Sequence, residues 1–293
     1  MRILLFILVN MMLLPAQAVV SKYDLELLPK DNYAKAAFCY WQPEGINTVK
    51  AVVVLVPGLN ADGRDMVDDP TWQSFALSHN FALLACYFTD RKPKSAGYCQ
   101  ASLGSGTALI EALGIFAAKT GHKEVESAPL LLWGHSAGGQ FNYEFACWKP
   151  DRTIAFIVNK GGYYHTKNPS DKTRNIPALF FAGEKDEEFR IKNIKELFQN
   201  GRTQGALWAL AIEPNAGHEI GGTRELAIQF FETIVPLRLK ANAELTDLAE
   251  DSGWIGDATT FEIKPAESNT KHAGSWLPNR FMARRWRTFI MHK

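Results

Sequence analysis

The sequence predicts an α/β fold in which a mostly parallel central sheet is covered by helices on both faces. Short continuous apolar runs alternate along the chain with longer segments whose apolar residues recur at helical spacing. Continuous apolar runs are typical of parallel strands that are buried on both faces. The 293 residues, of which 46% are hydrophobic and 22% charged, are enough to bury a sizeable core of this kind.

The expected elements follow one another along the chain. Residues 51–56, AVVVLV, form a strand that stops at Pro57–Gly58, and residues 71–79 form the first helix. An N-terminal strand or hairpin is expected within residues 19–49. Further strands are expected at 81–88, 130–133, 153–160, 177–183 and 206–212, and further helices at 106–120, 138–148, 187–200 and 223–235.

The N-terminal end has the pattern of a secretory signal peptide. Arg2 precedes the almost wholly apolar residues 3–14, and Ala16-Gln17-Ala18 supplies a small-x-small cleavage site. The apolar stretch is short for a membrane anchor, which needs about 20 residues. We therefore expect residues 1–18 to be removed and the protein to be secreted or periplasmic, without an integral membrane segment.

The C-terminal residues 236–293 are expected to be an extension that packs on the main domain, residues 19–235. The extension begins polar and ends in a helix with one apolar face. A basic helix lying on a membrane surface is the alternative interpretation, because arginines occupy the rest of that helix. The residues of the apolar face are Met282, Trp286, Phe289 and Ile290.

Charge and cysteine content exclude several classes of protein. The net charge of +1 gives no support for a nucleic-acid partner. The sequence has neither Cys-x-x-Cys nor His-Glu-x-x-His, so we expect no metal site. Export would permit disulfides, and Cys86 with Cys99 is the easiest pair to envisage, whereas Cys147 could equally be a buried thiol.

Ser136 lies in Gly134-His135-Ser136-Ala137-Gly138, a Gly-x-Ser-x-Gly motif between an expected strand and an expected helix. Such a turn is tight, needs small flanking residues and lifts the serine hydroxyl above the sheet edge. The following helix directs its partly positive N-terminus to the same place. Ser136 is therefore the candidate nucleophile.

A serine nucleophile needs a base and an acid. His218 follows the strand at 206–212 and precedes the helix at 223–235, so it lies at the same sheet edge as Ser136 and is the candidate base. Asp186, which lies shortly after the strand at 177–183, is the preferred acid. Glu184 and Glu187 remain alternatives to it.

Two backbone amides are expected to form an oxyanion hole. Ala137 supplies the first, because it follows the nucleophile directly. The second is expected from the loop PGLNADG, where Leu59 is preferred and Asn60 is the alternative. Gly58 is expected to let this loop turn closely enough to aim the donor.

The order Ser136, Asp186, His218, with VPGLN upstream and GHSAGG at the turn, resembles the α/β-hydrolase superfamily over roughly residues 35–235. The chain is similar in particular to secreted, lid-poor feruloyl and acetyl-xylan esterases and to polyhydroxyalkanoate depolymerase-like proteins. It departs from the pattern in two ways. Pro57 stands where many members have histidine, and the C-terminal extension has no place in the basic family fold.

The loop between the strands at 153–160 and 177–183 is too short for a lid domain. An open site would admit bulky or polymeric substrates. Asn60, Tyr163, Tyr164 and His165 lie near the expected site and are candidate substrate contacts.

The sequence thus predicts a secreted serine hydrolase that cleaves small or polymeric carboxylic esters through an acyl-enzyme, with no metal, cofactor or nucleic acid. A serine peptidase or acyltransferase with the same triad is the alternative, followed by a non-catalytic binding protein on this scaffold. The oligomeric state is left open.

Overall fold

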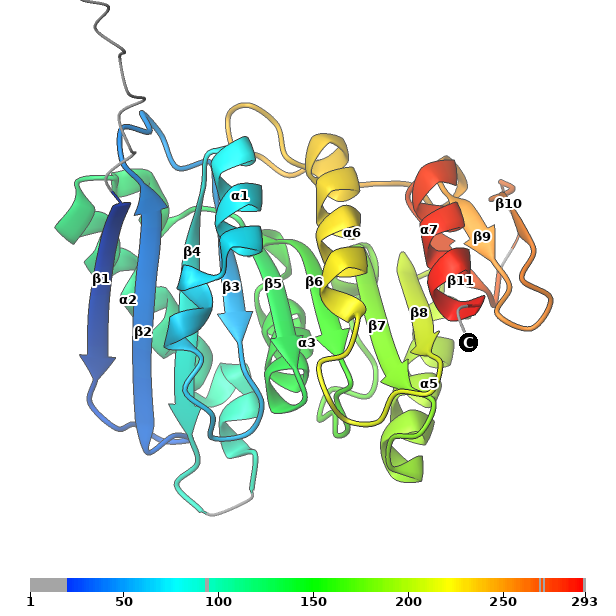
Figure 1. The fold of residues 1–293 in the computed structure, drawn as a ribbon, viewed down its shortest axis with the longest axis horizontal. Coiled ribbons are helices and arrows are strands. Elements are labelled where there is room, and N and C mark those ends of the chain that lie inside the picture. The colour runs from blue at the N-terminus through cyan, green and yellow to red at the C-terminus, as the bar shows by residue number, and fades with distance from the viewer. Residues whose placement is uncertain (1–19, 93–94, 269, 271, 292–293) are drawn as a thin grey trace, which may run out of the picture.

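An eight-stranded sheet runs through the molecule, in the order β1-β2-β4-β3-β5-β6-β7-β8 (Figure 1). The computed structural model describes residues 20–92, 95–268, 270 and 272–291. β1 pairs with β2 and β2 with β4 in antiparallel fashion, and all other neighbours are parallel. The strands are β1 (Val20–Leu27), β2 (Lys35–Pro43), β3 (Ala51–Val56), β4 (Phe81–Thr89), β5 (Leu130–His135), β6 (Thr153–Asn159), β7 (Ala178–Gly183) and β8 (Trp208–Glu213).

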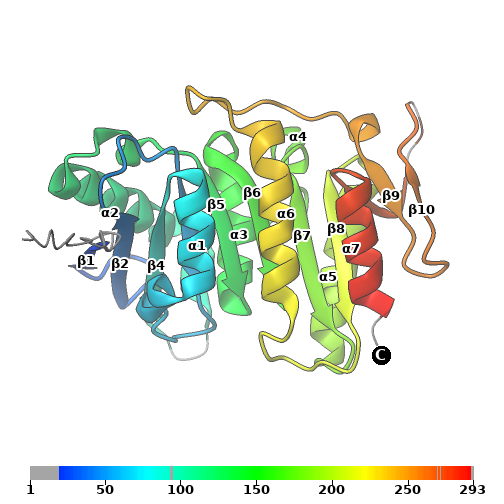
Figure 2. The ribbon, with the colours of Figure 1, turned by 45° about the horizontal axis from the view of Figure 1, so that its top comes forward.

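Helices cover both faces of this sheet (Figures 1 and 2). α1 (Pro70–His79), α6 (Thr223–Arg238) and α7 (Arg280–Met291) pack on one face. α2 (Ser105–Thr120), α3 (Ala137–Trp148) and α5 (Glu188–Arg202) pack on the other, and α4 (Asp171–Arg174) is a single turn before β7. In β3, Val52 and Val54 join one core while Val53 and Leu55 join the other. This double burial explains why the strand is apolar at every position.

The predicted α/β fold with a mostly parallel sheet is therefore confirmed. The carboxyl ends of the parallel strands β5 to β8 lie along one edge, at the bottom of Figure 1. In such sheets ligands bind at that edge. The turns after β5, β7 and β8 carry Ser136, Asp186 and His218 respectively.

The C-terminal segment contains a small sheet that the sequence did not predict. β9 (Trp254–Gly256) pairs antiparallel with β10 (Ile263–Pro265) and with β11 (Ser275–Leu277). Strands of three residues are too short to show a recognisable apolar period. The predicted terminal helix is present as α7.

α7 and β11 contact the outermost strand of the main sheet. The indole N–H of Trp286 donates to the carbonyl of Leu210 in β8 at 2.8 Å, and the N–H of Leu210 donates to Ser275 Oγ at 3.0 Å. Trp286 and Met282 are fully buried against the sheet. The predicted signal peptide lies outside the described residues, within which no helix has the length and apolar character needed to cross a bilayer.

None of the disulfides that export would permit is formed, and all four cysteines are free thiols. Cys86 and Cys99, the pair favoured from the sequence, are both fully buried, and burial raises the pKa of each thiol. The Cys99 thiol instead donates to the carbonyl of Ala137 at 3.1 Å. Cys99 therefore packs beneath the turn that carries Ser136.

Candidate active site

Ser136 occupies a strained turn between β5 and α3. Its φ of 54° and ψ of −119° lie in a region that side-chain-bearing residues rarely adopt. A methyl group on Gly134 would collide with the backbone of Gly138, and one on Gly138 would collide with the carbonyl of Val56. The motif glycines are thus required by space, and the turn holds the Ser136 side chain at the sheet edge.

His218 lies between Ser136 and Asp186. Its Nε2 is 2.9 Å from Ser136 Oγ, and its Nδ1 is 2.9 Å from Asp186 Oδ2. With the proton on Nδ1, the imidazole donates to the carboxylate and accepts from the serine hydroxyl. The structure therefore brings the three predicted residues together in the order that proton transfer requires.

Asp186 is the acid that meets His218. Its side chain is 1% exposed, and its Oδ1 accepts a hydrogen bond from the N–H of Glu187 at 2.8 Å. Glu184 accepts from the N–H of Asn215 and the Glu187 side chain pairs with Arg190, so neither carboxylate reaches His218. Arg190 Nε also lies 3.8 Å from Asp186 Oδ1.

The N–H groups of Leu59 and Ala137 are the predicted oxyanion donors. Both residues line the cavity beside Ser136, and neither N–H donates to a partner within the described part of the chain. Ala137 is the first residue of α3, where an amide has no intrahelical acceptor. Such paired free amides could stabilise a developing oxyanion.

Asn60 and Gly58 differ from what the sequence predicted. Asn60 Oδ1 accepts from the N–H of Asp90 at 2.8 Å, so the side chain fastens the loop to the end of β4 and does not line the cavity. A methyl group on Gly58 would make ordinary contacts, 3.6 Å from His135 Nδ1 and 3.7 Å from Ser136 Cβ. The loop therefore does not need glycine at this position for space.

The cavity above Ser136 has a volume of about 680 Å³. Tyr163 and His165 line it, and the Tyr163 ring stacks on Phe189 with centroids 5.1 Å apart. Tyr164 is a correction to the predicted substrate contacts. It is 4% exposed, lies outside the cavity lining and packs edge-on against Tyr143 in the core.

Two buried polar side chains of α3, missed from the sequence, hold the wall of this cavity. Gln140 Oε1 accepts from the N–H groups of Gly162 and Tyr163 at 2.9 and 3.0 Å. Glu144 Oε1 accepts from the N–H of His165 at 2.7 Å. Gln140 and Glu144 stand four apart in a helix that is mostly apolar, and this spacing was the signal that could have revealed them.

His135, which directly precedes Ser136, contacts the backbone of His218. Its Nε2 is 2.8 Å from the carbonyl of His218, and burial lowers its pKa to about 4. The neutral imidazole donates through Nε2–H and supports the loop that carries His218. Asn159 and Lys160, also missed from the sequence, contact the same loop.

Among the described residues, no cluster of three or more histidine, cysteine or acidic side chains is arranged to hold a metal ion. The site brings together a serine hydroxyl, an imidazole, a buried carboxylate and two backbone amides. With these groups it can carry out acyl transfer.

The mostly parallel sheet and the turns at its carboxyl edge define an α/β-hydrolase fold. A poly(3-hydroxybutyrate) depolymerase from Bordetella parapertussis shares this fold, with a TM-score of 0.53 and 19% identity over 79% of this chain and 92% of that chain. A poly(aspartic acid) hydrolase from Sphingomonas shares it with a TM-score of 0.53 and 17% identity, over 71% and 97% of the two chains. A ferulic acid esterase shares it with a TM-score of 0.54 and 12% identity, over 73% and 97%. No protein-family model and no curated protein sequence matches the chain.

Proposed function

We propose that this protein is a serine hydrolase that cleaves carboxylic esters through an acyl-enzyme intermediate. The observation that carries the proposal is the hydrogen-bonded chain from Ser136 Oγ through His218 to Asp186, beside an open cavity. Serine is a weak nucleophile unless a base is placed in this way. The fold neighbours, which are named as a depolymerase, a hydrolase and an esterase, support the same reaction class.

In the proposed reaction Ser136 Oγ attacks the ester carbonyl while His218 Nε2 takes the hydroxyl proton. The Asp186 carboxylate stabilises the imidazolium that results. The N–H groups of Leu59 and Ala137 donate to the oxyanion. His218 then returns the proton to the departing alcohol, and water cleaves the acyl-enzyme by the same steps in reverse order.

The proposed substrates include bulky or polymeric esters. The chain between β6 and β7 contains only the single turn α4, so this loop forms no cap over Ser136. The aromatic pair of Tyr163 and Phe189 offers a face on which an aryl or sugar group could stack. The names of two fold neighbours, a polyester depolymerase and a poly(aspartic acid) hydrolase, also support a polymeric substrate.

The test uses a fluorophosphonate probe together with hydrolysis of p-nitrophenyl acetate and butyrate. The wild type should label and hydrolyse, and Ser136→Ala should do neither at an unchanged melting temperature. A folded wild type that neither labels nor hydrolyses would contradict the proposal. If adding an alcohol yields a new ester, the result would favour an acyltransferase. Cleavage of peptide anilides would favour a peptidase. Ligand binding without turnover would favour a binding protein.

We further propose that residues 19–235 form the catalytic domain, that residues 236–293 are an extension packed on it, and that the protein is exported. The pattern of Arg2, the apolar residues 3–14 and Ala16-Gln17-Ala18 supports export. N-terminal sequencing of the mature protein should begin at Val19. A mature N-terminus at Met1 would contradict the export proposal.

A further inference from the structure

The loop that carries His218 is held by three side chains from beneath. The carbonyls of three consecutive residues, 218, 219 and 220, each accept a side-chain hydrogen bond. The donors are His135 Nε2 at 2.8 Å, Lys160 Nζ at 2.7 Å and Asn159 Nδ2 at 3.1 Å. All three donors lie at the carboxyl ends of β5 and β6, so the loop rests directly on the sheet edge.

Lys160 is the central donor and is unusual in two respects. Its side chain is 0% exposed, and its φ of 53° lies in the left-handed region. A buried ammonium is costly unless it is paired and hydrogen-bonded. Lys160 Nζ meets both needs, because it contacts the carbonyl of Glu219 and lies 2.7 Å from Glu213 Oε2.

Glu213 adds a contact at the far end of the loop that carries His218. Its Oε1 accepts a hydrogen bond from the N–H of Gly222 at 2.6 Å. Gly221 has a φ of 65°, and a methyl group there would collide with the Glu213 carboxylate. The ion pair of Lys160 and Glu213 therefore fixes the backbone of residues 219–222, directly after His218.

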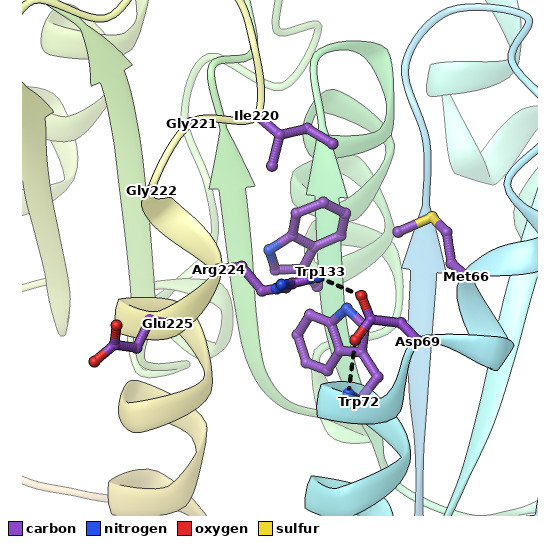
Figure 3. A pocket seen from close by; sticks show the side chains of 9 residues that line it. All are labelled: Met66, Asp69, Trp72, Trp133, Ile220, Gly221, Gly222, Arg224 and Glu225. Atoms are coloured by element: carbon purple, nitrogen blue, oxygen red, sulfur yellow. Dashed lines mark hydrogen bonds and ion pairs between the residues drawn. The ribbon is translucent and has the colours of Figure 1, made fainter.

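The other side of the same loop borders a cavity. A cavity of about 480 Å³ lies between the first turns of α1 and α6, and Figure 3 shows Ile220 above Trp133 at its roof. Gly221 and Gly222 line the same roof, and the ion pair of Asp69 with Arg224 spans the cavity lower down (Figure 3). Because close packing is missing on this side, the position of the loop depends on its polar contacts.

We infer that Lys160, paired with Glu213, is a positioning residue that sets the distance of His218 Nε2 from Ser136 Oγ. It touches neither substrate nor the reacting atoms and acts through the carbonyl of Glu219. The inference rests on the proposed function, in which His218 is the base. A displacement of about 1 Å at a reacting group can cost roughly 100-fold in rate, so a small shift of this loop has a measurable effect.

The test compares kcat, KM and the rate of fluorophosphonate inactivation in Lys160→Met/Glu213→Gln with those of the wild type. The double change removes both buried charges, whereas Lys160→Met alone would strand the carboxylate. We expect kcat and the inactivation rate to fall together by roughly 10- to 100-fold while KM stays within about twofold. A folded double variant with wild-type kcat and inactivation rate would overturn the inference.

A matched control is the ion pair of Arg202 and Glu250, which is 2.7 Å long and has a fully buried arginine. Arg202→Met/Glu250→Gln should lower the melting temperature without changing kcat, and an equal loss of kcat there would show a general stability effect. If the Lys160 double variant does not fold, Glu213→Gln keeps an acceptor for Gly222. It should then lower kcat by about threefold or more at constant KM, and an unchanged kcat would overturn the inference. The wild type's own activity tests the proposed function separately.

Discussion

Asp186→Asn should reduce kcat by about 10⁴-fold, and the structure explains why an almost isosteric change is so costly. The two carboxylate oxygens of Asp186 both act as acceptors, one from the N–H of Glu187 and the other from His218 Nδ1. An asparagine has only one such oxygen. If that oxygen still accepts from the N–H of Glu187, the amide NH₂ faces His218 Nδ1. Because an NH₂ group is a donor, Nδ1 must then be the unprotonated nitrogen and the ring proton lies on Nε2. The ring can then no longer accept from Ser136.

The size of this effect follows from the wrong tautomer, which costs about 10⁴-fold in a Ser-His-Asp triad. At about 1.36 kcal/mol for each factor of ten, the barrier rises by about 5.4 kcal/mol. The assay is steady-state hydrolysis of p-nitrophenyl butyrate at pH 7.5, with the melting temperature measured for each variant.

The matched controls are Glu184→Gln and Glu187→Gln, because these carboxylates bond to Asn215 and Arg190 and not to His218. Each control should stay within about threefold of wild-type kcat, since a partly exposed pair contributes about 1 kcal/mol or less. If either control loses as much activity as Asp186→Asn, or if Asp186→Asn stays active, the assignment of the acid is wrong.

Three further predictions concern the turn, the cavity wall and the pH dependence of stability. Gly138→Ala should lower the melting temperature and reduce kcat at least tenfold, because the added methyl group has no space. The kcat of Gly58→Ala should stay within a few-fold of wild type, since a methyl group there makes ordinary contacts. Equal effects in the two variants would contradict this prediction. Tyr163→Ala should raise KM for aryl esters about fivefold, because roughly 1 kcal/mol of stacking is lost, while Tyr164→Phe should leave KM unchanged. The reverse result would show that Tyr164, and not Tyr163, contacts the substrate. Because burial lowers the folded-state pKa of His135 to about 4, its contribution to stability is present above the ordinary value of 6.5 and is lost as pH falls from 6.5 toward 4. In urea unfolding, the free energy of unfolding should fall less between pH 6.5 and 4 in His135→Gln than in the wild type. If this free energy falls equally with pH in both proteins, the lowered pKa of His135 is refuted.

The residues that share a motif or follow a strand end could be placed from the sequence. Ser136, Asp186 and His218 each come shortly after an apolar run, and parallel strands bring their carboxyl ends to one edge. Spatial proximity therefore follows from the alternation of strands and helices alone. Their catalytic roles remain predictions that the proposed experiments test.

The contacts that the sequence could not reveal depend on side-chain direction or on long separations. Tyr163 and Tyr164 are adjacent, yet one lines the cavity and the other lies in the core, because an irregular loop has no period that assigns its faces. Lys160 reaches a carbonyl 59 positions away, and nothing in its own surroundings indicates a buried charge. The sequence left disulfide pairing open, because nearness of two cysteines along the chain does not fix the distance between their thiols, and all four thiols are free.

The contacts of Trp286 and Ser275 with β8 cover the free edge of the main sheet. β8 is the last strand of the sheet, and an uncovered last strand offers free N–H and C=O groups to another molecule. Both backbone groups of Leu210 are already bonded to the C-terminal segment. A chain ending after α6 would keep Ser136, Asp186 and His218 but expose this edge. We expect such a chain to aggregate through the exposed edge of β8 and to lose hydrolysis as a result.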